Sequence, residues 1–287
     1  MSESASILYA VTSMVGFGLA DFFAKTIVSR TSAYRTVLIS QSIGSIPFLG
    51  LTFLYDLAVP DERLLLLTIL SGTLSSLYLF SFYKALSLGK ASLVSPVSSC
   101  LTVVALALSV TILGERLTLP QAVLIAVVLA GILLIALQKG APRTAASNAS
   151  IALSLVVVFG AGSNAIVQKW ITESGHILLG FLLTRFVMLS ILLACFPVLE
   201  RVGGGVEGGS AGYSRLALLG LIDVFAFFAW FLSLSKGFVS IVAPITNSSA
   251  VITIILAHIF LKERVHLTQR IGIIAIILGI AVLSAIS

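Results

Sequence analysis

Charged residues are scarce in this chain of 287 residues: they make up 10 % of it, against about 25 % in a soluble globular domain. Hydrophobic residues make up 59 %, and they gather in apolar runs of about 20 residues, the length that crosses a bilayer as a helix. The strands of a membrane barrel would alternate polar and apolar residues over about 10 positions, and these runs do not. The composition therefore predicts an all-α polytopic membrane protein, whose backbone groups pair within each helix.

Residues that usually carry chemistry are also few. The three histidines are dispersed, and both cysteines fall inside apolar runs. Neither zinc-ligand spacing nor a phosphate-binding glycine loop is present, so we expect no metal, no cofactor and no ATP hydrolysis. A membrane-embedded enzyme would need His, Asp or Ser clustered at one interface, and the sequence offers no such cluster, so we expect no enzyme. The net charge of +6 is spread singly over short loops, which is not the pattern of a nucleic-acid surface.

What the chain does contain is an internal repeat. Residues 89–137 align without a gap on residues 237–285 at an offset of 148, and 14 of these 49 pairs are identical. A weaker match at an offset of 144 aligns Lys25 with Lys169. An internal repeat in a membrane chain indicates a two-halved transporter with its site where the halves meet. The most informative shared pairs are Gly89 and Gly237, Ser92 and Ser240, Pro96 and Pro244, Glu115-Arg116 and Glu263-Arg264, Gln121 and Gln269, and Gly131 and Gly279.

The apolar runs predict ten transmembrane helices, near residues 5–28, 34–55, 63–83, 90–113, 118–137, 150–172, 176–199, 213–234, 238–261 and 267–286. We divide the chain into a first five-helix repeat (1–137), a polar linker (138–149) and a second five-helix repeat (150–287). Because five is odd, two homologous halves must cross the membrane in opposite senses, as inverted repeats do.

Basic residues predict the orientation. Alternate loops, beginning after the first span, hold twelve Lys and Arg residues, and the opposite loops hold four. The positive-inside rule places the twelve in the cytoplasm, so both termini are expected on the non-cytoplasmic side of the plasma (inner) membrane. The start, MSESAS, is too short and acidic for a signal n-region, so we expect the first span to be retained.

The pattern GERLTLPQ followed by a glycine-punctuated apolar span, present twice, resembles the drug/metabolite transporter superfamily, and within it the EamA-type ten-helix branch. In the second copy Lys262 replaces Gly114 and His266 replaces Thr118. The resemblance covers essentially the whole chain. It implies export of amino acids or other small metabolites by a proton- or gradient-coupled carrier or by facilitated exchange. It also implies a central cavity built by the third, fourth, eighth and ninth helices.

Two charged residues lie at membrane depth, where each costs about 2.5–3.5 kcal/mol on insertion scales. Arg185 and Asp223 both fall near the middle of their spans. We expect Arg185 to meet a substrate carboxylate and Asp223 to meet an amine or a proton; alternatively, the two pair and hold the second half together. Their repeat equivalents are Gln41 and Ser75, so the charges occur in one half only, which suits an unsymmetrical ligand.

Further polar residues leave two interpretations open. Asp21 is either a proton-coupling carboxylate or the partner of Lys25 in an i,i+4 ion pair. Asn164 lies one turn before Gln168 and either bonds a neighbouring helix or lines the substrate pathway. The Glu115-Arg116 and Glu263-Arg264 pairs fall at span ends and are interpreted as locks of helix hairpins.

Pro96 and Pro244 each free a backbone carbonyl one turn earlier, so we expect two kinked helices that act as hinges and line a cavity. Simple packing of small residues is the alternative. Apolar and aromatic stripes complete the expected wall, although Trp230 would also suit an interface anchor. The substrate-binding candidates are Ser75, Tyr78, Ser99, Cys100, Asn164, Arg185, Asp223, Phe227, Trp230, Asn247 and Ser248, and the proton-coupling candidates are Asp21 and Asp223.

We therefore predict a secondary transporter of small polar or amphipathic metabolites, foremost an amino-acid exporter, that works by alternating access as a monomer in the lipid bilayer. A non-transporting scaffold or assembly subunit, and a facilitated exchanger of nucleotide- or sugar-type metabolites, are the alternatives. The duplicated proline-kinked spans argue against a scaffold, which has no use for a paired hinge.

Overall fold

The structure, a computed structural model, describes residues 2–28, 30–51, 59–136, 145–195, 198–199, 202, 212–263 and 266–286. These residues are helical or lie in short connections, with no strand among them, which confirms the all-α prediction. The first half contains α1 (Ser2–Val28), α2 (Ala33–Leu51), α3 (Glu62–Leu88), α4 (Ala91–Ser99), α5 (Leu101–Ile112) and α6 (Leu119–Ala136). The second contains α7 (Ala145–Glu173), α8 (Ile177–Ala194), α10 (Tyr213–Lys236), α11 (Val239–Thr246), η1 (Asn247–Ser249), α12 (Ala250–Phe260) and α13 (Leu267–Ile286).

Within the described residues, seven helical segments are long and apolar enough to cross a membrane. Two of them are broken helices, Ala91–Ile112 and Val239–Phe260, and two shorter apolar helices lie in α6 and α13. The helix α2 belongs to neither group. The chain is thus a multi-pass membrane protein, while the count of ten spans stays a prediction.

Part of the predicted linker is helical. Residues 145–149 form the first turn of α7, so this helix begins before the expected boundary at 150. The remainder of the linker, residues 138–144, lies outside the described residues, as does Arg264.

Both broken helices carry a proline. Pro96 lies in α4 and Pro244 in α11, and each helix is interrupted within about a turn, at Cys100 and at Asn247–Ser249. Because proline has no N–H, the carbonyl of Ser92 loses its helical donor. The side chain of Gln269 from the other half donates to that carbonyl at 3.2 Å. The proline kinks are therefore present, and their role as hinges stays a prediction.

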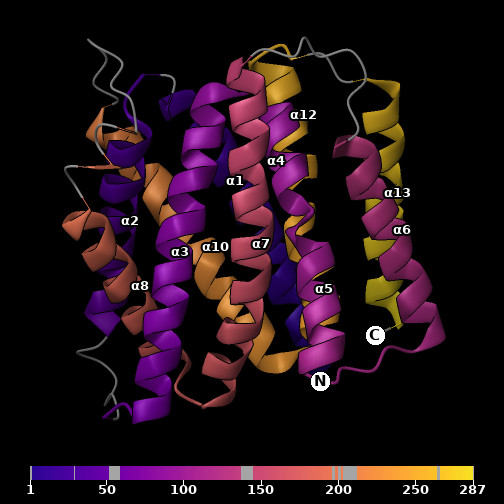
Figure 1. The fold of residues 1–287 in the computed structure, drawn as a ribbon. Helices are drawn as coiled ribbons and strands as arrows, with labels where there is room; N and C mark the ends of the chain where they lie inside the picture. Colours follow the sequence, from indigo (N-terminus) through magenta and orange to yellow (C-terminus); the bar gives the residue numbers. More distant parts are fainter. Residues whose placement is uncertain are drawn as a thin grey trace.

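The helices α1 and α7 run in opposite directions. The Ser6 hydroxyl, near the start of α1, and the Lys169 ammonium, near the end of α7, both donate to carbonyls at the C-terminal end of α10. Lys25, near the end of α1, and Ser150, near the start of α7, both donate to carbonyls at the C-terminal end of α3. Repeat-equivalent helices are therefore inverted, and both chain termini lie at the same end of the bundle (Figure 1).

Two equivalent lysines cap two equivalent helices. Lys25 donates to two carbonyls at the end of α3, at 2.8 and 2.5 Å, and Lys169 donates to two at the end of α10, at 2.8 and 2.9 Å. The last carbonyls of a helix have no partner within the helix, and a cation there satisfies them. Lys25 is thus committed to α3, and no ion pair within 4.0 Å joins it to Asp21 among the described residues.

Two equivalent glutamates cap helices of the opposite half. Glu115 accepts from the backbone N–H groups of Val239 and Ser240, both at 2.8 Å, at the N-terminus of α11. Glu263 accepts from the N–H of Ser92 in α4 at 3.2 Å. We call these contacts the Glu115 cap and the Glu263 cap. They join the two halves, so the interpretation as locks within one hairpin was wrong: each glutamate bonds the repeat that it does not belong to.

The turn before each glutamate explains why a lysine can replace a glycine at one position of the repeat. Gly114 has a φ of +67° and Lys262, its equivalent, has a φ of +54°. The left-handed conformation is open to glycine without cost and to other residues at roughly 1–2 kcal/mol. The fold therefore keeps this turn in both halves and lets a lysine occupy it in one.

The helices α2 and α10 approach closely where each has a glycine. A Cβ on Gly44 would collide with the carbonyl of Gly220, and a Cβ on Gly220 would collide with the carbonyl of Ser40. One turn away from this contact stand Gln41 on α2 and Asp223 on α10. The close glycine contact therefore brings a polar side chain of the first half against a carboxylate of the second.

Candidate functional site

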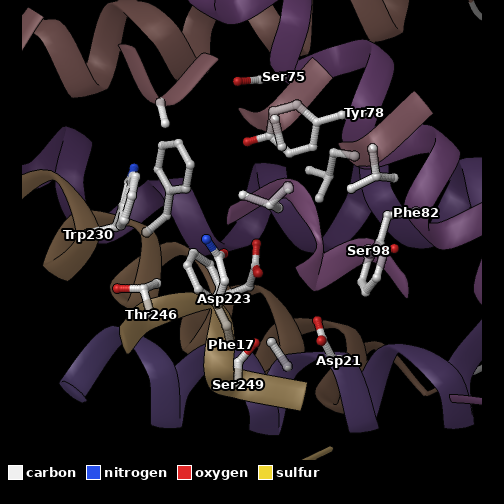
Figure 2. Close-up of a pocket in the computed structure, with 18 of the residues that line it drawn as sticks. Phe17, Asp21, Ser75, Tyr78, Phe82, Ser98, Asp223, Trp230, Thr246 and Ser249 are labelled. Carbon is white, nitrogen blue, oxygen red and sulfur yellow. The ribbon is translucent and has the colours of Figure 1, made fainter. Parts of the chain in front are cut away.

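A cavity of about 140 Å³ lies between the two halves. It has many times the roughly 10–15 Å³ that one water needs. Side chains of α1, α3, α4, α7, α8, α10, α11 and η1 form most of its wall. In Figure 2, Ser75 lies on one side of the cavity, Asp21 and Ser249 on the opposite side, and Asp223 between them.

Gln41 bridges the two charged residues that were expected at midplane. Arg185 Nη1 donates to Gln41 Oε1, and Gln41 Nε2 donates to Asp223 Oδ2 at 2.6 Å. An arginine only donates and a carboxylate only accepts, so the amide fits in one orientation. The alternative that Arg185 and Asp223 pair directly is not what the structure has: within the described residues, no ion pair of 4.0 Å or shorter joins them.

Arg185 is buried yet has free donor groups. It is 4 % exposed, and its guanidinium carbon lies 4.1 Å from the centre of the Phe227 ring and 5.5 Å from that of Phe181. Its Nε and Nη2 have no hydrogen-bond partner among the described residues. These two nitrogens form the fork that binds a carboxylate or a phosphate in bidentate fashion.

Other polar atoms without partners belong to residues of the cavity wall. Of the nine such buried side-chain atoms in the described residues, six belong to residues that line this cavity, two of them on Arg185. The Trp230 indole donates to Gln168 Oε1 at 2.7 Å, while the amide nitrogen of Gln168 has no partner among the described residues. The remaining three belong to Ser98, Thr184 and Asn247. Buried polar atoms normally have partners, so this concentration makes the cavity the candidate site for a polar ligand.

Asp21 is held at the cavity wall by two hydroxyl groups. Its Oδ2 accepts from Ser95 Oγ at 2.7 Å and from Thr253 Oγ1 at 3.4 Å. Because Lys25 caps α3 instead, the ion-pair interpretation of Asp21 was wrong. The lysine side chain instead reaches the carbonyls at the C-terminal end of α3, which have no partner within that helix and attract a cation.

Most predicted site residues line the cavity, and three do not. The Cys100 side chain packs instead against the apolar residues between α6, α12 and α13. Asn164 donates to Ser75 Oγ at 3.1 Å, so it bonds a neighbouring helix, as the alternative had it. Ser248 donates to the carbonyl of Pro244 at 2.7 Å and is fully buried. The lining set includes Ser75, Tyr78, Ser99, Arg185, Asp223, Phe227, Trp230, Asn247 and Asp21.

The sequence analysis missed some residues of the wall. Phe17, Ser95, Ser98 and Thr184 line the cavity, and Gln41 lies directly behind it. One available signal was the repeat itself. Ser95 aligns with Ala243, and a polar residue opposite an alanine indicates a position that the fold does not require to be polar.

A mostly apolar cavity with a few polar groups, placed between two inverted halves of a multi-pass membrane protein, is typical of the class of small-molecule transporters. The sequence matches the EamA-like transporter family over residues 4–137 and again over residues 148–285, and the chain belongs to this family. The recognised resemblance to EamA-type transporters is thereby confirmed.

Two further similarities agree with a two-repeat architecture. An uncharacterized protein of Methanocaldococcus jannaschii is 31 % identical over 135 residues, which make up 47 % of this chain and 98 % of that protein. A unit of about one repeat is thus a nearly complete protein in that archaeon. A solved structure described only as "Crystal structure of protein" covers 99 % of this chain and 100 % of its own, with a TM-score of 0.73 and 14 % identity, which shows a shared fold.

Proposed function

We propose that the chain is a secondary transporter that exports a small carboxylate-bearing metabolite, foremost an amino acid, across the inner membrane. The observation that carries this proposal is the set of buried, unpartnered polar atoms on the residues that line the cavity, among them the Arg185 fork. Membership of a transporter family favours a carrier over an enzyme.

The donor groups indicate which end of the substrate binds where. Arg185 Nε and Nη2, Gln168 Nε2 and Asn247 Nδ2 all donate, so they favour a ligand rich in acceptor oxygens. A carboxylate matches the arginine fork. Asp223 uses Oδ2 to accept from Gln41, and its Oδ1 has no hydrogen bond within the described residues, so it is the candidate partner of a substrate amine. Phe227 and Trp230 provide the apolar surface for a side chain.

Alternating access is the proposed mechanism. The two halves are inverted copies that meet at the cavity, and each contributes a helix that is broken beside a proline. In such an arrangement, rocking of one half against the other exposes the same site to either side. Asp21 and Asp223 are the candidate coupling groups, and a proton carried on either one would link transport to the proton gradient. The bundle encloses its own site, so we propose a monomer with a small-molecule substrate.

Counterflow in proteoliposomes tests this function. Wild-type protein should exchange a labelled amino acid saturably, and the unlabelled amino acid should compete while its amide and its decarboxylated amine, which lack a carboxylate, should not. Arg185→Ala should abolish the exchange, and Arg185→Lys should weaken it strongly, because an ammonium cannot form the planar fork. Arg63→Ala, at an exposed arginine near the start of α3, is the matched control.

Two outcomes would contradict the proposal. Equal competition by the amide would remove the carboxylate from the recognition, and unchanged exchange in a folded Arg185→Ala protein would remove the arginine. Because Arg185 is buried, size-exclusion elution and helicity of the variants are compared with wild type first.

A further inference from the structure

We infer that Asp21, Ser95 and Thr253, together with two backbone carbonyls, form a binding site for a monovalent metal cation, Na⁺, in the wall of the cavity. The binding itself is independent of the metabolite, and only its effect on transport rests on the proposed function.

Three oxygen atoms lie around the Thr253 hydroxyl, and the Ser95 hydroxyl joins the cluster through Asp21. Its Oγ1 lies 3.2 Å from the Gly18 carbonyl, 3.3 Å from the Ser249 carbonyl and 3.4 Å from Asp21 Oδ2, and Ser95 Oγ lies 2.7 Å from the same Oδ2. A hydroxyl has one proton, so Thr253 satisfies at most one of its three acceptors. Clusters of carboxylate, hydroxyl and carbonyl oxygens beside an interrupted helix are what hard cations bind in membrane carriers.

The negative charge of Asp21 has no cationic partner nearby. Among the described residues, no lysine, arginine or histidine nitrogen lies within 4.0 Å of its carboxylate. Lys25, one turn further along α1, is held by the carbonyls at the end of α3. Ser95 and Thr253, which pack against it from α4 and α12, are neutral and nearly or fully buried. A carboxylate in such surroundings is costly unless a cation accompanies it.

The mirrored position in the other half shows that the fold does not require these polar groups. The repeat equivalents of Asp21, Ser95 and Thr253 are Ala165, Ala243 and Ala105, and all three alanines are buried. The fold therefore accepts three alanines at the equivalent place, and the polar set at one end has a purpose other than packing.

The backbone frame around the two positions is the same. A Cβ on Gly18 would lie 2.8 Å from the Ser249 carbonyl, and a Cβ on the equivalent Gly162 would lie 2.9 Å from the carbonyl of Leu101, which is equivalent to Ser249. A glycine thus lets the first helix of each half approach the broken helix, and only one of the two approaches is lined with oxygen ligands.

The charge of the ligand set favours a monovalent ion. One carboxylate balances one positive charge, whereas calcium sites typically collect several carboxylates. A proton on Asp21 would neutralise the carboxylate, but it could bond only one further acceptor. A Na⁺ ion would balance the charge and contact the carboxylate, hydroxyl and carbonyl oxygens together.

Binding of Na⁺ has a predictable effect on the proposed substrate. The ion neutralises a carboxylate that lines the same cavity as Arg185, so it lowers the repulsion felt by a substrate carboxylate. Na⁺ should therefore tighten substrate binding, and the substrate should tighten Na⁺ binding by the same factor. A coupling of about 5-fold or more is expected, as is typical of linked sites.

The experiment is equilibrium binding of radiolabelled Na⁺ to the purified full chain in detergent, with choline chloride keeping the ionic strength constant. Wild type should bind one Na⁺ per chain saturably, without any substrate. A triple variant with Asp21→Ala, Ser95→Ala and Thr253→Ala should lose this binding, and it is expected to fold because the mirrored position is built from alanines. Thr253→Val alone should weaken binding by about 10-fold or more. Glu173→Gln, at an exposed carboxylate of α7, is the control that should bind normally.

Absence of saturable Na⁺ binding in wild type, or its persistence in the folded triple variant, overturns the proposal. Counterflow that ignores the replacement of Na⁺ by choline and follows a proton gradient would assign Asp21 to the proton instead. Because Na⁺ binding is measured without substrate, its failure is distinguishable from failure of the transport assay with Arg185→Ala.

Discussion

Removing one of the two glutamate caps tests how the halves are held together. Glu115 is 7 % exposed and accepts two backbone N–H groups of α11 at 2.8 Å. Its equivalent, Glu263, is half-buried and accepts one N–H of α4 at 3.2 Å. The same substitution can therefore be made at two equivalent positions of one protein. Glu115→Ala removes two short hydrogen bonds, and Glu263→Ala removes one longer hydrogen bond.

The magnitudes follow from the number and quality of the bonds. A hydrogen bond to a charged group contributes about 1.5–3 kcal/mol, so Glu115→Ala should cost about 3–6 kcal/mol and Glu263→Ala about 1.5 kcal/mol. At this chain length a loss of 1 kcal/mol lowers Tm by about 2 °C. The expected decreases in Tm are therefore about 6–12 °C for Glu115→Ala and about 3 °C for Glu263→Ala.

Thermal unfolding in detergent, followed by tryptophan fluorescence, measures these shifts. Glu115→Gln is the graded control: it keeps an acceptor oxygen without the charge, and a neutral hydrogen bond is about half as strong, so its Tm should fall between those of wild type and Glu115→Ala. Equal shifts for the two alanine variants, or a larger shift for Glu263→Ala, would refute the reasoning from bond number and burial.

Two further predictions concern the α2–α10 contact. Gln41→Leu should raise the half-saturating substrate concentration in counterflow by about 10-fold or more, which is equivalent to about 1.4 kcal/mol. The reason is that Arg185 and Asp223 lose the amide that orients them. An unchanged half-saturating concentration would show that the Gln41 bridge does not contribute to substrate binding. Gly44→Ala should destabilise by about 1–3 kcal/mol, since its Cβ collides with α10. Gly50→Ala on the same helix has open space and should leave Tm unchanged or raise it, and a similar loss in both variants would argue against the collision.

Several features were predictable from local sequence alone. The spans near 63–83 and 213–234 correspond to α3 (Glu62–Leu88) and α10 (Tyr213–Lys236), because apolar runs bounded by charged or glycine residues define a membrane helix wherever it packs. The depth of Arg185 and Asp223 in their spans was sufficient to place both at the cavity. The matched prolines predicted the two broken helices.

The direction in which a side chain points was less predictable. Ser99 lines the cavity, while its neighbour Cys100 packs toward α6, α12 and α13. Cys100 is the residue at which the helix is interrupted, and there the periodicity that relates positions on one face no longer applies. Ser248, in the interrupted segment η1, donates to the carbonyl of Pro244 itself and does not line the cavity.

The sequence by itself determined that this chain is an all-helical membrane protein of two related halves, because hydropathy and repetition are properties of the chain order. Only the tertiary structure decided that Gln41 joins Arg185 to Asp223, that Lys25 belongs to α3 rather than to Asp21, and that each glutamate caps the opposite half. Such contacts join residues that are far apart in the sequence, and they depend on the distance and direction between helices. Small residues such as Gly44 and Gly220 set that distance, and no local pattern records which glycine meets which.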